Sequence, residues 1–231
     1  MKERGMIFNG EMVRAILDGR KTQTRRIMAP QPADDIERCI FSNPEAIGWK
    51  SSLRHKHGST TAHFCHYGKP GDRIWVRETA RCEWQRGDFK DAAFETGVTY
   101  KADGERQSFR SAEQHKTFPR RSHATNGDLA WHPSIHMPRW ACRILLEITD
   151  VRVERLNAIS EEDAEAEGID MEALYDSQDC YDCIADHNMT GRPTVTGAFK
   201  YLWESIYGEE SWKANSWVWV IEFKRIEGGA A

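Results

Sequence analysis

The hydrophobic pattern begins with a short apolar stretch at residues 6–8, which predicts a strand. A helix is predicted at residues 11–18, because the apolar side chains there recur on one face. Gly19 follows the last apolar position directly, and glycine at this place is typical of a left-handed helix cap. The cap is expected to end the helix and to lead into a strand at residues 22–28, where Thr22, Thr24 and Ile27 give strand character.

Further along the chain, alternating apolar positions predict strands at residues 73–77, 141–156 and 216–226, the second with a bend near Thr149 and Asp150. Ser160, followed by acidic residues, predicts a capped helix that runs to Gly168. An apolar stripe predicts a last helix at residues 196–206. Residues 28–68, 80–133 and 170–195 show no sustained period and are interpreted as loop-rich insertions on a framework of residues 5–27, 69–79, 141–169 and 196–226.

The composition favours a folded protein. Of the 231 residues, 39% are apolar and 29% are charged, and nine Trp and nine Phe supply enough large side chains for a core. We expect one domain, residues 1–231. No apolar stretch approaches the roughly 18 residues of a membrane span, and the opening MKERGMIFNGEMV lacks the apolar region of a signal peptide. We therefore expect a cytoplasmic protein that does not bind membranes.

Charge and cysteine content narrow the function classes. The net charge of -4 argues against a protein that coats nucleic acid nonspecifically, because such binding needs many cations. Six cysteines without an export signal are expected to be reduced thiols. Cys180 and Cys183 have C-x-x-C spacing with His187 nearby, but a zinc site would need a fourth ligand and the second C-x-x-C of a zinc ribbon is absent. We expect no metal and no cofactor.

The segment GRKTQTRR, residues 19–26, concentrates four cations and two hydroxyl groups after the predicted helix. Arginine offers a planar fork for phosphates and base edges, lysine a point charge, and threonine hydroxyls orient either group. This chemistry suits a phosphate-bearing or nucleobase ligand. The alternative interpretation is a solvated, highly charged edge strand, and the segment alone does not separate the two.

Several segments together resemble one known family. They are the GRKTQTR segment after a helix, PGDRIWVRE, ITDVRVERLNAISEEDAEAEG and WVIEFKRI. In this combination the chain resembles the ASCH domain family, and in IHMPRWA and SWVWVIEF it is similar to large prophage-borne bacterial members. The resemblance covers roughly half of the chain. It implies an α+β fold similar to PUA domains, a small β-barrel with flanking helices, and a cleft that receives RNA, a nucleotide or a modified nucleoside.

The resemblance also implies an activity, because some small bacterial relatives are amidohydrolases that remove the acetyl group from N4-acetylcytidine. By this resemblance the catalytic residues are Lys21, Thr24 and Glu167. Such a reaction needs a nucleophile, a base and a proton donor for the leaving nitrogen. Thr24 would attack or position water, Lys21 would act as a base with a lowered pKa, and Glu167 would hold the lysine or transfer the proton. The alternative interpretation of Glu167 is one more carboxylate on an acidic helix.

Four further residues are predicted to contact the ligand: Arg20, Arg26, Trp75 and Arg77. The last two share one face of a strand that the family places near its cleft. Most of the other tryptophans are interpreted as core residues. Three hypotheses remain: an amidohydrolase acting on an acylated cytidine, a noncatalytic module that binds RNA or a modified base, and a phage accessory protein acting on host nucleic acid or on a protein partner that the sequence does not identify.

Overall fold

The computed structural model describes residues 1–40, 47–54, 58, 60–85, 95–110, 131–176 and 194–226. The chain forms two compact units. The first unit combines Met1–Asp18, Arg73–Glu147 and the C-terminal residues from Arg225, and the second combines Gly19–Asp72 with Ile148–Lys224. The predicted single domain of residues 1–231, with its framework and insertions, stays a prediction.

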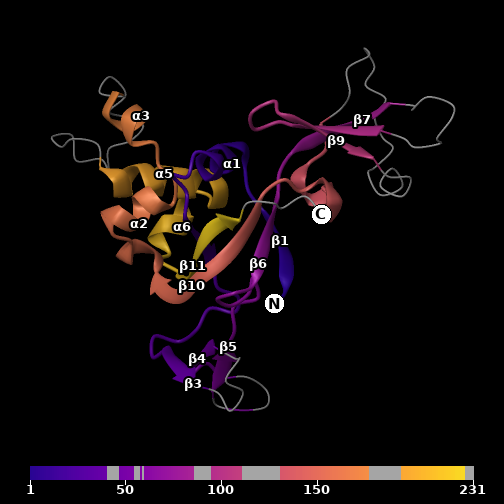
Figure 1. Ribbon diagram of the computed structural model, residues 1–231. Helices are drawn as coiled ribbons and strands as arrows, with labels where there is room; N and C mark the ends of the chain where they lie inside the picture. Colours follow the sequence, from indigo (N-terminus) through magenta and orange to yellow (C-terminus); the bar gives the residue numbers. More distant parts are fainter. Residues whose placement is uncertain are drawn as a thin grey trace. The chain divides into compact units, whose positions relative to one another are not determined.

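The first unit contains a mixed sheet and a separate antiparallel sheet (Figure 1). Strand β1 runs parallel to β6, and the first residues of β10 pair antiparallel with β6. Strands β7, β8 and β9 form the antiparallel sheet, whose buried side chains, among them Val98 and Tyr100, pack with Met137 and Cys142. The elements are β1 (Glu3–Ile7), α1 (Gly10–Leu17), β6 (Arg73–Arg77), β7 (Ala80–Gln85), β8 (Glu95–Tyr100), β9 (Arg106–Arg110), the short 3-10 helices η2 (Ser134–His136) and η3 (Arg139–Ala141), and the start of β10 (Leu145–Arg155).

The second unit packs helices against a β-sheet. Strand β2 pairs antiparallel with β11, and Phe199 and Trp203 of α5 pack with Val218 and Val220 of β11. The antiparallel strands β3, β4 and β5 form a small sheet of their own (Figure 1). The elements are β2 (Gln23–Ile27), β3 (Glu37–Ile40), β4 (Ile47–Ser51), β5 (Thr61–His63), the rest of β10, η4 (Leu156–Ala158), α2 (Glu161–Ala166), α3 (Met171–Asp176), α5 (Val195–Tyr207), α6 (Glu210–Lys213) and β11 (Trp217–Ile226).

The predicted β-barrel is wrong, although the fold is mixed α and β. The largest sheet has the strand order β1-β6-β10-β11-β2, so in the part of the chain that the structure describes it is open, with β1 and β2 as its edges. A barrel would require the first and last strands to pair. Alternating side chains predict strands, but they do not determine whether the outermost strands meet, and this is why the sequence pattern alone could not exclude an open sheet.

The insertions are also more regular than the expected loops. Residues 28–68 contain β3, β4 and β5, and residues 80–133 contain β7, β8 and β9. Each set forms a three-stranded sheet. The strands in these segments are short or carry charged residues on the exposed side, so they produce no long apolar period.

The predicted elements around the candidate site are confirmed. Helix α1 buries four apolar side chains and is followed by Gly19 with a φ of 79°. Strands β2, β6 and β11 form where alternation predicts them. Ser160 caps α2 by accepting a hydrogen bond from the backbone N–H of Asp163. Among the described helices, none has the length and apolar character required to cross a membrane.

Candidate functional site

Lys21 and Glu167 form a buried ion pair in the second unit. Glu167 ends α2, and a β-bridge joins it to Lys21 just before β2. The Lys21 Nζ donates hydrogen bonds to the Glu167 carboxylate Oε2 at 2.6 Å and to the Glu167 main-chain carbonyl at 2.7 Å. The two residues are 2% and 3% exposed. The structure therefore brings these two predicted residues into contact, and their catalytic role stays a prediction.

Burial changes the acid–base properties of this pair. Removal from water disfavours the charged form of an amine, and this effect lowers the pKa of Lys21 below its ordinary value. The carboxylate of Glu167 opposes it, whereas the positive charges of Arg26 and Arg25 add to it. A larger fraction of Lys21 is consequently in the neutral form than for a lysine on the surface, and only the neutral amine can accept a proton.

Arg25 connects the ion pair to further carboxylates. Its side chain is fully buried and donates from Nη2 to Asp163 at 2.8 Å and to Glu154 at 3.1 Å. Its Nη1 reaches Oε1 of Glu167 at 3.5 Å, while Lys21 occupies the other carboxylate oxygen. The guanidinium also lies 5.9 Å from the centre of the Phe199 ring. In the sequence analysis, Arg25 is only one of the four cations of residues 19–26.

A second arginine extends this network. Arg152 on β10 donates to Asp163 at 2.8 Å, to Glu154 at 2.6 Å and to the side-chain oxygen of Gln23 at 2.9 Å, and it also pairs with Glu222 on β11. Asp163 thus accepts hydrogen bonds from two arginines. These interactions lower the pKa of the Asp163 carboxyl against the opposing effect of its burial. These hydrogen bonds connect α2, β2 and the second half of β10 at the site.

The Thr24 hydroxyl makes no hydrogen bond to the ion pair. Side chains alternate along a strand, so Thr24 is directed to the face of β2 opposite Gln23 and Arg25. It lies opposite Ile221 of β11 and is fully buried. Its hydroxyl has no hydrogen-bond partner among the described residues. The structure therefore joins two of the three predicted catalytic residues and leaves the third with an unsatisfied polar group.

The two predicted ligand contacts of the second unit lie beside this pair in sequence. Arg20 donates from Nη1 to the carbonyl oxygen of Gly168 at 2.8 Å, so it binds the turn that follows α2. Arg26 lies on β2 opposite Trp219, and its charge also acts on the phenol of Tyr67. Both arginines are half-buried, and the charge of Arg26 acts on Lys21.

Trp75 and Arg77 lie on β6 in the first unit. The Arg77 guanidinium stacks 5.3 Å from the centre of the Trp75 ring, and its Nε donates to the carbonyl oxygen of Ser134 at 3.1 Å. The Trp75 ring covers Gly5 of β1, where an added Cβ would come within 2.6 Å of the ring. Within their unit, both side chains have structural contacts of their own, and their assignment to a ligand stays a prediction.

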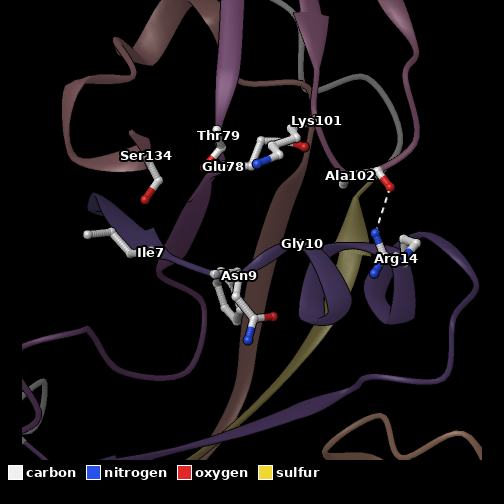
Figure 2. Close-up of a pocket in the computed structure, with 10 residues that line it drawn as sticks. Ile7, Asn9, Gly10, Arg14, Glu78, Thr79, Lys101, Ala102 and Ser134 are labelled. Carbon is white, nitrogen blue, oxygen red and sulfur yellow. Dashed lines mark hydrogen bonds between the residues drawn. The ribbon is translucent and has the colours of Figure 1, made fainter. Parts of the chain in front are cut away.

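A pocket of about 370 Å³ lies in the first unit. Figure 2 shows Ser134, Thr79 and Lys101 along one side of it and Asn9 and Arg14 along the other. Arg14 donates to the carbonyl oxygen of Ala102 at 2.8 Å. Glu78 also lines the pocket. The sequence gives no signal for this pocket, because its residues come from segments far apart in the chain and share no motif.

Glu78 and Arg143 form a buried ion pair within a charge cluster whose other carboxylates are more exposed. Arg143 holds both carboxylate oxygens of Glu78 at 2.9 Å and reaches Asp103 and Glu105 at 2.7 Å and 2.6 Å. Its guanidinium lies 4.1 Å from the centre of the Tyr100 ring. Burial raises the pKa of Glu78 above its ordinary value, although the bonds to Arg143 oppose the rise. The cluster was not predicted from the sequence.

In the part of the chain that the structure describes, no group of three or more His, Cys, Asp or Glu residues is placed to hold a metal ion. Cys180, Cys183 and His187 lie outside the described residues.

Comparison of the chain with protein-family models, with curated proteins and with solved structures finds no match. The functional argument therefore depends on the residues of the site themselves.

Proposed function

We propose that this protein binds a modified nucleoside, free or within RNA, and hydrolyses the amide of an N4-acetylcytidine-like substrate at the Lys21–Glu167 pair. The observation that carries the proposal is the 2.6 Å contact between the Lys21 amine and the Glu167 carboxylate at a position where both are almost fully buried. A lysine with a lowered pKa beside a carboxylate supplies a base and a proton-transfer partner in one contact.

Water is the nucleophile that this arrangement favours, since Thr24 is directed to the other face of β2. The neutral Lys21 amine takes a proton from water as the oxygen attacks the acetyl carbon. The bond between this carbon and N4 then breaks, and the proton passes through Lys21 or Glu167 to the leaving amine. The products are acetate and cytidine. The substrate reaches the pair only by local opening, because Lys21 and Glu167 are 2% and 3% exposed.

The choice of substrate rests on the resemblance of GRKTQTR and ITDVRVERLNAISEEDAEAEG to the ASCH family, which we include in the proposal. The positive charge of Arg20 and Arg26 beside Lys21 supports a ligand with phosphates or polar base edges. A cytoplasmic location is also part of the proposal. None of the described cysteines, Cys39, Cys65, Cys82 and Cys142, forms a disulfide, and this is expected in a reducing compartment.

The test is to incubate the purified protein with N4-acetylcytidine and to follow cytidine and acetate by chromatography. Lys21→Met is expected to abolish turnover. Lys213→Met is the matched control, because Lys213 also pairs with a glutamate but is 71% exposed and lies on α6. Both variants are checked for folding by circular dichroism. Equal turnover in Lys21→Met and in the unchanged protein would refute the assignment of Lys21.

A noncatalytic module that binds RNA or a modified base is the second candidate. The placement of Thr24 favours it, since a threonine that does not reach the lysine removes one member of the catalytic set carried over from the family. This candidate predicts that N4-acetylcytidine or RNA binds to the protein without being converted. Binding without turnover in the same experiment, followed by equilibrium titration, would replace the enzyme by the module. The third hypothesis, an accessory protein of a phage, is supported by no observation on the described residues.

A further inference from the structure

The carboxylate of Glu167 is shared between two cations, and the two contacts differ in length. Lys21 binds Oε2 at 2.6 Å, whereas Arg25 reaches Oε1 at 3.5 Å. Arg25 does not come closer because its other terminal nitrogen is bonded to Asp163 at 2.8 Å and to Glu154 at 3.1 Å. The position of the guanidinium is thus set by carboxylates outside the ion pair.

This arrangement also determines the orientation of the Glu167 side chain. A free carboxylate beside a single lysine could rotate and present either oxygen. With Arg25 on the Oε1 side, only Oε2 faces the amine. We propose that Arg25 is a positioning residue of the Lys21–Glu167 site, held by Asp163 and Glu154 so that it fixes the Glu167 carboxylate and limits how fully that carboxylate pairs with Lys21. The inference rests on the proposed function of this pair and adds a residue to it.

The physical consequence concerns the proton on Lys21. Arg25 is a permanent positive charge next to the amine, and such a charge lowers the pKa of a lysine. It also attracts part of the negative charge of Glu167 that would otherwise stabilise the ammonium form. Both effects act in the same direction, toward a neutral amine. Arg26 on β2 is the other cation that acts on Lys21, and Glu167 is the carboxylate that opposes them.

The test is a titration of the Lys21 side chain by NMR, with lysine labelled at Cε and Nζ in the full chain. In Arg25→Gln, the pKa of Lys21 is expected to rise, because one positive charge at short range has been removed. Arg155→Gln is the matched control: Arg155 lies in the same unit and stacks 4.4 Å from the centre of the Trp217 ring, but it bonds to Asn215 and pairs with Asp34. It should leave the Lys21 titration unchanged.

Asp163→Asn provides a second variant with the opposite sign, and it serves if Arg25→Gln does not fold. It keeps the charge of Arg25 but removes one carboxylate that neutralises this charge, so the pKa of Lys21 should fall. A purely structural role of Arg25 would lower the melting temperature in both variants without moving the Lys21 titration in opposite directions. An unchanged Lys21 pKa in a folded variant, or shifts of the same sign in both, would overturn the inference.

The titration is independent of turnover, so the two proposals fail separately. If the Lys21 pKa shifts as expected but N4-acetylcytidine is not hydrolysed, the proposed reaction is wrong and the positioning role stands. If the protein hydrolyses the substrate and the titrations do not move, the reaction stands and the role of Arg25 is wrong. Where turnover is observed, Arg25→Gln should lower kcat about 10-fold or more, by analogy with the loss of a general base, and leave KM nearly unchanged.

Discussion

Replacement of Arg143 by methionine should destabilise the protein strongly, because it leaves a buried carboxylate without its partner. The side chains of Arg143 and Glu78 are each 2% exposed, and two hydrogen bonds of 2.9 Å join them. Methionine retains much of the apolar stem of arginine but removes the charge and all donors. The Glu78 carboxylate would then lie beside the Tyr100 ring with no cation to balance it.

The size of the stability loss depends mainly on Glu78, and much less on Asp103 and Glu105, the more exposed carboxylates that bond to Arg143. Removing one member of a buried ion pair costs about 3–5 kcal/mol. The carboxylates of Asp103 and Glu105 are 29% and 53% exposed, so water replaces much of what they lose, and such pairs contribute about 0–1 kcal/mol. We therefore expect a loss of about 3–5 kcal/mol at neutral pH. In a chain of 231 residues this corresponds to a fall in Tm of about 6–20 °C.

The loss should depend on pH with a definite sign. Burial already raises the pKa of Glu78 in the unchanged protein, and removal of Arg143 removes the bonds that oppose the rise. A carboxyl with a raised pKa in the folded state binds a proton more tightly there than in the unfolded chain. Its contribution to stability is complete below the ordinary glutamate pKa of about 4.3 and is lost as the pH rises through the raised value. The defect of Arg143→Met should accordingly be smaller in mild acid than at neutral pH.

Urea denaturation at several pH values, followed by tryptophan fluorescence, measures these differences. Arg139→Met is the matched control in the same unit, because Arg139 also bonds to a glutamate, Glu3, but both side chains are about one-third exposed. It should cost less than about 1 kcal/mol. The double variant Arg143→Met with Glu78→Leu should recover most of the loss, since no charge is left buried. A loss below about 1 kcal/mol in the single variant, or no recovery in the double variant, would refute the reasoning.

Two further predictions concern the elements that position the candidate site. Ser160→Ala should reduce stability by about 0.5–2 kcal/mol, because it removes the side-chain cap of α2, and Ser160→Asp should retain it; equal urea midpoints for the two variants would contradict this role. Gly19→Ala should cost about 1 kcal/mol, because Gly19 has a φ of 79°, whereas Gly10→Ala, at a helical position with only ordinary contacts, should not destabilise. Urea midpoints of these two variants provide the comparison, and similar values would show that the cap does not need glycine.

The elements that the sequence predicted well are those with local signals. Gly19 marks the end of α1 and Ser160 the start of α2, because a cap depends on residues within one turn of itself. The apolar alternation of β10 is also visible, and its phase shifts between Ile148 and Val151, where a bend was expected. In contrast, the order of the strands in the largest sheet depends on pairings between residues far apart in sequence. The alternation along each strand carries no information on these pairings, which explains the wrong prediction of a barrel.

In the candidate site, too, contacts between residues far apart in sequence could not be predicted from local signals. Lys21 and Glu167 could be paired from the sequence only through the family resemblance, since 146 positions separate them. The partners of Arg25 and Arg143 could not be found in this way, because a charged residue in the sequence looks the same whether it is solvated or buried. Thr24 is a different case. A motif places it three residues after Lys21, the alternation along β2 directs its side chain to the face opposite Gln23 and Arg25, and its catalytic role stays a prediction.

The two buried arginines place carboxylates in different electrostatic situations, and this difference is the reason why we place the proposed acid–base group in the second unit. Arg143 bonds to both oxygens of Glu78 at 2.9 Å, so the charge of this carboxylate is matched by a cation that cannot lose its proton. Arg25 stays 3.5 Å from Glu167 and leaves the closer contact to Lys21, a cation that can lose its proton. Burial and the neighbouring arginines lower the pKa of that lysine. The first arrangement fixes a charge, whereas the second permits its transfer, and a site for proton-transfer chemistry requires the second.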